Sequence, residues 1–204
     1  MKHGSYKTIK KPAESLFKDR GSKFIGFACP VKNETEVKDL LDKLRMKYHD
    51  ASHHCYAWRL GPEKEHFRSN DDGEPSNTAG KPIMGQIQKH DLTNIIIVVI
   101  RYFGGTLLGT GGLINAYRKA AADALEQSAI ITETVDEVYD IEFPYSAMNM
   151  VMKVLKEEQA EQVMQDFSMK CAIRVRMPLN KSEKLAKRLE RIDSVNYKKV
   201  PGSY

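Results

Sequence analysis

Long apolar runs are missing from this sequence of 204 residues. The longest, residues 95–100, is far shorter than the ~20 residues that a membrane-spanning helix needs. No apolar segment follows the lysine-containing start, MKHGSYKTIKK, so we expect no secretory signal. Together these absences predict a cytoplasmic protein.

Cysteine is also scarce. Cys29, Cys55 and Cys171 are odd in number, widely spaced and form no C-x-x-C pair. A disulfide framework or a structural zinc site is therefore not expected, and we interpret the three residues as reduced thiols that pack as small apolar side chains. We expect no metal and no other cofactor.

The remaining composition is that of a folded protein. The chain is 41% hydrophobic and 29% charged. Its length of 204 residues suits one large domain or two small ones and is enough to bury a core. Its net charge of +5 is uneven, because residues 1–130 contain 20 Lys and Arg against 15 Asp and Glu, whereas residues 131–204 contain 12 of each kind. The excess favours a polyanionic partner for the first part.

Hydrophobic periodicity predicts a mixture of strands and helices in the first part. Asn33 and Glu36 have the spacing of a helix start, and the β-branched run at 95–100 is typical of a strand covered on both faces. The expected strands lie at 23–31, 53–60 and 95–100, and the expected helices follow Asn33, span 81–89 and begin at about Leu113.

Past residue 130 the pattern changes to βαββαβ, the order of a ferredoxin-like domain. The strands are expected near 134–143, 161–167, 170–177 and 195–200, with helices opened by Pro144 and by Asn180 with Glu183. We therefore predict two domains, 1–130 and 131–204, and an α+β fold.

A glycine-rich segment is the strongest chemical signal. Residues 104–112 join the buried strand to a helix, where backbone N–H groups can converge on an anion. The segment lacks the Lys-Ser/Thr of a P-loop and the third glycine of a dinucleotide fingerprint. Anion binding and a purely structural need for glycine both remain open. The candidate anion- or nucleic-acid-binding residues are Arg101, Gly104, Gly105, Gly109, Gly111, Gly112, Arg118 and Lys119.

Asp71, Asp72 and Glu74 form an acidic cluster in the turn-rich segment 70–80. Such carboxylates can hold Mg²⁺ or act as general bases. They can equally cap the loop or pair with an arginine, for which Arg68, Arg101 and Arg118 are the candidates, and we favour this structural interpretation. His49 and His53 imitate a zinc-protease motif, but their spacing crosses from a helix into a strand, so no zinc site is expected.

Two blocks of sequence carry a resemblance to a known family. The first is DDGEP at 71–75 with TAGKP at 78–82, and the second is RYFGG at 101–105 with LGTGGL at 108–113 and AY at 116–117. In this order and spacing they closely resemble the IMPACT/YigZ family, in its bacterial form. The resemblance implies a first domain folded like the second domain of a small-subunit ribosomal protein, and a ferredoxin-like second domain similar to one in elongation factor G.

The resemblance also implies a role in translation. Eukaryotic relatives regulate translation by competing for an activator of a stress-response kinase, through an extra N-terminal domain that this chain is expected to lack. For this chain we favour an RNA- or ribosome-binding protein that modulates translation, with a translation-factor protein as a further candidate partner and with no catalytic residue assigned. The alternatives are an enzyme acting on a phosphorylated small molecule in a cleft between residues 71–75 and 104–112, and a protein-interaction module that uses the C-terminal sheet.

Overall fold

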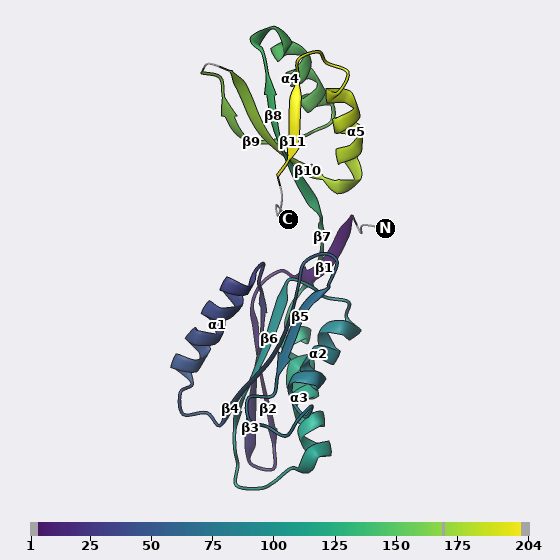
Figure 1. Ribbon diagram of the computed structural model, residues 1–204. Coiled ribbons are helices and arrows are strands. Elements are labelled where there is room, and N and C mark those ends of the chain that lie inside the picture. The colour runs from purple at the N-terminus through teal and green to yellow at the C-terminus, as the bar shows by residue number, and fades with distance from the viewer. Residues whose placement is uncertain (1–3, 169, 201–204) are drawn as a thin grey trace. The chain divides into compact units, whose positions relative to one another are not determined.

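The computed structural model describes residues 4–168 and 170–200. By its contacts the chain forms two compact units, one spanning Tyr6–Glu133 and the other comprising Thr134 onward with the N-terminal residues up to Ser5. The mixture of sheets and helices confirms the α+β class (Figure 1). The analogies of the two parts to ribosomal-protein and elongation-factor domains stay predictions.

An antiparallel five-stranded sheet forms the centre of the Tyr6–Glu133 unit. Its central strand is the expected apolar run, whose side chains from Ile95 to Arg101 are all buried because helices cover both faces. The order across the sheet is β2 (Ala13–Asp19), β3 (Ser22–Pro30), β6 (Ile95–Tyr102), β4 (His53–Leu60) and β5 (His66–Asn70).

Three helices cover this sheet. Figure 1 shows α1 on one side and α2 with α3 on the other, and two separate apolar cores lie between these layers. Asn33 caps α1 as expected, since its Oδ1 accepts the N–H of Glu36 at 2.9 Å. The helices are α1 (Glu34–Lys47), α2 (Gly80–Lys89) and α3 (Gly109–Glu126).

Two further strands pair at the ends of this unit. β1 (Ser5–Ile9) and β7 (Ile130–Thr134) form a two-stranded sheet, and the hydroxyl of Tyr6 donates to Glu133 at 2.7 Å. Strands β1, β2, β5 and β7 are not among those that the sequence predicts; β7 meets the expected strand 134–143 only at its last residue, Thr134. β2 and β5 are the edge strands of the five-stranded sheet, and β1 and β7 are short and pair only with each other. Short or edge strands such as these leave a weak hydrophobic pattern.

The second unit has the predicted βαββαβ order. An antiparallel sheet ordered β11-β8-β10-β9 packs one face on two helices around an apolar core. The helix expected to start at Asn180 begins at Leu179 with Pro178 as its N-cap, because the preceding strand runs directly into it. The elements are β8 (Asp136–Phe143), the 3-10 turn η1 (Tyr145–Ala147), α4 (Met148–Glu157), β9 (Glu161–Asp166), β10 (Cys171–Pro178), α5 (Leu179–Leu189) and β11 (Asn196–Lys199).

None of the helices within 4–168 and 170–200 combines the length and the apolar character needed to cross a membrane.

Candidate functional site

The carboxylate of Asp71 organises the loop between β5 and α2. Its Oδ1 accepts the backbone N–H groups of Ala79 at 3.0 Å and Gly80 at 2.8 Å, and its Oδ2 accepts that of Asn77 at 2.9 Å. A helix start leaves such N–H groups without intrahelical partners. Asp71 therefore satisfies the beginning of α2 and holds the loop in one conformation.

Asp72 fixes the two histidines that begin β4. Its Oδ2 accepts the backbone N–H of His54 at 2.6 Å, and its carbonyl oxygen lies 2.7 Å from Nδ1 of His53. Because a carbonyl oxygen can only accept, we assign the hydrogen of His53 to Nδ1. In the neutral form of the ring, Nε2 of His53 is then the nitrogen that can accept a hydrogen bond.

His54 is expected to make this unit sensitive to acid. Burial lowers the pKa of His54, although Asp72 opposes the shift. The unfolded chain then binds the proton more readily than the folded one, so stability rises with pH up to about 6.5, the ordinary histidine pKa. We expect the free energy of unfolding to fall between pH 7.5 and 5.5, and to fall less in His54→Gln. Urea titrations followed by the fluorescence of Trp58, the single tryptophan, test this; equal falls would show that His54 is not the cause.

Glu74 lies buried at the centre of a polar cluster. Its Oε1 accepts hydrogen bonds from Nη1 of Arg101 at 2.6 Å and from the hydroxyl of Tyr117 at 2.7 Å, and Nε2 of His53 lies 3.9 Å away. Of the three arginines that the sequence left open, the structure pairs Glu74 with Arg101. The buried Glu74–Arg101 ion pair needs further hydrogen bonds, such as that from Tyr117, because both of its charges are removed from water.

Arg101 comes from the end of β6, and its side chain is only 6% exposed. Its guanidinium carbon lies 5.5 Å from the ring centres of both Phe24 and Phe103, a cation–π arrangement. Nη2 donates to the hydroxyl of Ser22 at 3.4 Å, whereas Nε has no partner among the described residues. A buried N–H without a partner is costly, and such a group can be satisfied by a ligand. A phosphate contact by Arg101, which the sequence predicts, therefore stays a prediction.

The Cys55 thiol and the Tyr117 hydroxyl are buried next to this cluster. The sulfur of Cys55 lies 3.0 Å from the carbonyl oxygen of Asp71 and 3.3 Å from the hydroxyl of Tyr117. Burial raises the pKa of the Cys55 thiol and of the Tyr117 hydroxyl far above their usual ranges. Both remain protonated at neutral pH, so Cys55 supplies no thiolate nucleophile.

A cavity of about 540 Å³ opens beside Glu74 and Arg101. It lies between the two segments that the sequence singled out, the acidic loop and the start of α3. Its volume falls within the range of small-molecule sites. The lining residues are Ser52, His53, Glu74, Pro75, Arg101, Phe103, Leu107, Leu108, Gly109, Thr110 and Leu113.

The glycine segment divides between a loop and a helix. α3 begins at Gly109 and not near Leu113, so the expected helix start was wrong by one turn. Low helix propensity did not stop the helix, because the apolar side chains of its buried face pack into the core. Leu108 occupies the N-cap without a side-chain hydrogen bond, and no acidic residue lies in the first turn.

The five glycines therefore have different surroundings. Gly104 and Gly105 lie in the loop, and Gly109, Gly111 and Gly112 lie in the first turn of α3. Gly105 and Gly109 have φ of +85° and +71°, which strongly favour glycine. Gly111 has no such requirement, and a Cβ at this position would meet no atom within 4 Å.

The two remaining candidate cations lie exposed on the outer face of α3. Arg118 donates to the neutral side chain of Asn115 at 3.1 Å, and no carboxylate of residues 4–168 and 170–200 forms an ion pair with it. Lys119 pairs with Asp123 at 2.6 Å, and this hydrogen bond raises the pKa of Lys119. Neither residue lines the cavity beside Glu74.

Arg118 lies instead at a groove between α2 and α3, with a volume of about 590 Å³. The groove contains two cations and three amide side chains, and no carboxylate lines it. The lining residues are Asn77, Lys81, Pro82, Gly85, Gln86, Gln88, Ile114 and Arg118.

The sequence does not reveal three residues of the polar cluster around Glu74, namely His53, Cys55 and Tyr117. The pattern indicates His53 and Cys55 only as ordinary strand residues, and Tyr117 only as a core residue of α3. The alternation of β4 predicts a strand, and nothing local shows that these side chains meet the acidic loop. Across 4–168 and 170–200, no three His, Cys, Asp or Glu side chains lie together as metal ligands would.

Comparison with known proteins gives consistent matches. The Impact N-terminal domain family matches residues 20–125. IMPACT family member YvyE of Bacillus subtilis (strain 168) is 33% identical over 155 residues, which cover 76% of this chain and 71% of that protein. IMPACT family member YigZ of Escherichia coli (strain K12) is 31% identical over 170 residues, covering 82% and 83%.

One solved structure matches along nearly the whole chain. It is described as the crystal structure of a hypothetical protein and has a TM-score of 0.76 and 27% identity, covering 98% of this chain and 99% of that one. A eukaryotic match is shorter: the protein IMPACT homolog of Saccharomyces cerevisiae (strain ATCC 204508 / S288c) is 38% identical over 96 residues, covering 45% of this chain and 36% of that protein.

Proposed function

This chain belongs to the IMPACT family, and from that premise we propose that it is an RNA- or ribosome-binding protein that modulates translation. The role of eukaryotic members in translation supports the biological setting. RNA binding itself is inferred from the groove between α2 and α3. Lys81 and Arg118 provide positive charge there, and Asn77, Gln86 and Gln88 provide amide donors.

Phosphate groups are the ligands that such a surface suits. Phosphate oxygens accept hydrogen bonds from arginine, lysine and amide side chains without regard to sequence. Among the described residues no carboxylate forms an ion pair with Lys81 or Arg118, so both charges remain available. A backbone-binding groove of this kind would bind RNA with little preference for its bases.

Ribosome co-sedimentation at two salt concentrations tests this proposal. The protein should pellet with ribosomes at about 50 mM salt and be released at about 200 mM salt, because phosphate contacts displace counterions from RNA and weaken strongly over this range. A protein that stays in the supernatant at both concentrations, and that also binds no single-stranded RNA, would contradict the proposal.

Charge reversal locates the RNA-binding surface. Arg118→Glu with Lys119→Glu should weaken RNA binding for every sequence, and should lower the slope of log affinity against log salt by about 1 for each phosphate that the variant no longer binds. Most of the effect should come from Arg118→Glu alone, since Asp123 already neutralises Lys119. Fluorescence anisotropy of a labelled RNA measures both quantities.

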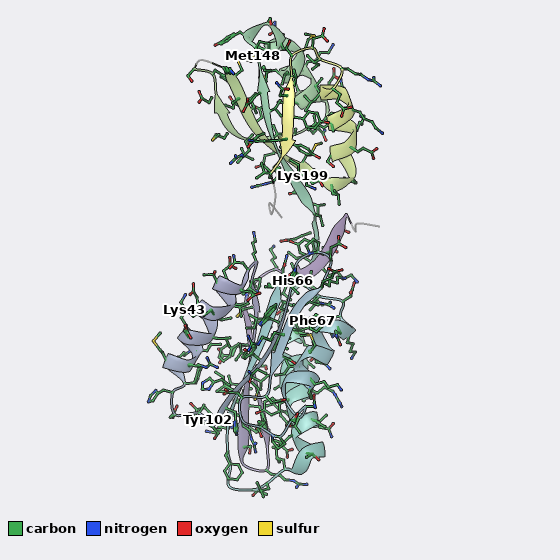
Figure 2. All side chains as sticks on the ribbon, viewed as in Figure 1. Lys43, His66, Phe67, Tyr102, Met148 and Lys199 are labelled. Atoms are coloured by element: carbon green, nitrogen blue, oxygen red, sulfur yellow. The ribbon has the colours of Figure 1, made fainter. Side chains whose placement is uncertain are left out.

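Lys43→Glu is the matched control. Lys43 lies exposed on α1, the helix on the opposite side of the sheet, as Figure 2 shows. Its reversal changes the net charge by the same amount as Arg118→Glu without touching the groove. An equal decrease in affinity in this variant would show that overall charge, and not the groove, governs binding.

The cavity favours a second candidate function. An enzyme acting on a phosphorylated small molecule would need a concave site between the acidic loop and the start of α3, and the cavity occupies this position. Incubating the protein with phosphorylated metabolites and following their conversion by mass spectrometry tests it. Absence of any conversion would favour a binding role alone.

A further inference from the structure

The cavity beside Glu74 combines two kinds of surface. One wall is apolar, and its side chains Phe103 and Leu107 are 49% and 81% exposed. The other side contains polar groups from His53, Glu74 and Arg101. Large apolar side chains exposed next to a cavity indicate a surface that a ligand covers.

The polar side has both acceptors and donors to offer. When the His53 ring is neutral, Nε2 is its acceptor nitrogen, because Nδ1 donates to the carbonyl oxygen of Asp72. The two donors to Glu74 both reach Oε1, which leaves Oε2 outside these bonds. Arg101 lines the cavity with a side chain that is only 6% exposed. Its Nε has no partner among the described residues, and because this atom is itself closed off from solvent, a ligand reaches it only if the side chain shifts.

The start of α3 adds a place for an anion. Gly109 and Thr110 line the cavity, and the first-turn N–H groups have neither a side-chain cap nor an acidic neighbour in that turn. These N–H groups and the helix dipole favour negative charge. Arg101 neutralises Glu74 at 2.6 Å, so the carboxylate does not repel an anion strongly.

We propose that this cavity binds one nucleotide, either as a free nucleoside monophosphate or as one residue of a single-stranded RNA. The base lies against Phe103 and the leucine side chains, its amino or imino N–H groups donate to His53 Nε2 or Glu74, and the phosphate meets the start of α3 and Arg101. This inference rests on the proposed function, and it adds a base-binding site separate from the α2–α3 groove.

Simpler ligands match fewer of these features. Inorganic phosphate would leave the apolar wall exposed to water. A fatty acid would cover that wall but would give His53 and Glu74 no donor. A nucleotide has an aromatic face, ring N–H donors and a phosphate, and single-stranded RNA is recognised through these same groups.

Isothermal titration of the full chain with UMP, CMP, AMP and GMP tests the proposal. At least one of the four should bind, and inorganic phosphate should bind at least about tenfold more weakly, a difference of about 1.4 kcal/mol. Thr110→Trp should block the cavity, and Thr110→Glu should place a carboxylate where the phosphate binds. Each should weaken nucleotide binding by about tenfold or more.

Asn115→Trp and Asn115→Glu are the controls. Asn115 is exposed on the same helix but does not line the cavity, so nucleotide affinity should not change. Thr110 is also exposed, and Thr110→Glu puts an acid in the first turn of a helix, where it is favourable. Circular dichroism melts confirm that each variant is folded.

The outcomes distinguish a nucleotide of RNA from a free nucleoside monophosphate, and they test the cavity separately from the α2–α3 groove. If octauridylate binds more tightly than UMP and loses affinity in Thr110→Trp, the nucleotide belongs to RNA; if UMP binds as tightly as the oligomer, it is a free metabolite. The cavity proposal would be overturned if the nucleotide that binds best had the same affinity for Thr110→Trp as for the unmodified protein, if phosphate bound as tightly as that nucleotide, or if none of the four bound. RNA binding that still depends on Arg118 would then leave the groove proposal standing.

Discussion

Arg101→Met is expected to lower the free energy of unfolding of the Tyr6–Glu133 unit by about 3–5 kcal/mol, the usual effect of removing one member of a buried ion pair. Methionine retains much of the length of the arginine side chain but leaves Glu74 as a buried, unpaired charge. Within the part of the chain that the structure describes, the Tyr117 hydroxyl, at 2.7 Å, would then be the remaining hydrogen-bond donor to its Oε1. Urea unfolding followed by Trp58 fluorescence measures the change.

A double-mutant cycle isolates the contribution of the pair. Glu74→Gln should also destabilise, and the double variant should lose less stability than the sum of the two single variants, because neither buried charge is then left alone. A decrease below about 1 kcal/mol in Arg101→Met would show that the pair contributes no more than an exposed one.

The sequence predicts the elements whose pattern is local and strong. β6 can be recognised from six consecutive β-branched residues, and α1 from the spacing of Asn33 and Glu36. β5 cannot, because its residues are mostly exposed and pair with only one neighbouring strand. A strand of this kind is held by backbone pairing, which leaves little trace in the order of its side chains.

In the candidate site, as in the fold, the sequence predicts what is local and misses what depends on tertiary contacts. The acidic loop and the glycine segment can be identified because their residues are contiguous, but their meeting at one cavity depends on the sheet order. β4 and β6 are neighbours in that sheet, and this pairing brings His53 opposite Arg101. The intervening sequence contains no signal for such a pairing, so its pattern indicates His53 only as an ordinary strand residue.

Charge alone also misleads the interpretation of single residues. The sequence groups Arg101, Arg118 and Lys119 as candidate phosphate contacts, yet the structure places them in three different environments: a buried pair, an uncompensated exposed charge and an exposed pair. Sequence composition counts these charges equally. Burial and the partner of each charge decide what it can bind, and both are properties of the fold.

Gly104→Ala should be among the most destabilising substitutions in the glycine segment. A Cβ at Gly104 would lie 1.9 Å from the carbonyl carbon of Gly21 and 2.2 Å from the backbone nitrogen of Ser22, in the tight turn between β2 and β3. Because both atoms are backbone, neither can rotate away. We expect the free energy of unfolding to fall by about 3 kcal/mol or more, at the upper end of the cost of overpacking. Urea unfolding followed by Trp58 fluorescence measures this change as well.

Gly111→Ala is the matched comparison for that substitution. Its backbone φ is not in the left-handed range and its Cβ would meet nothing within 4 Å, so alanine should leave stability unchanged or raise it by up to about 1 kcal/mol through higher helix propensity. If Gly111→Ala melts normally but binds nucleotide or RNA more weakly, Gly111 is required for approach of the ligand. If both variants are destabilised equally, the close approach of Gly104 to the β2–β3 turn does not explain why glycine is present there.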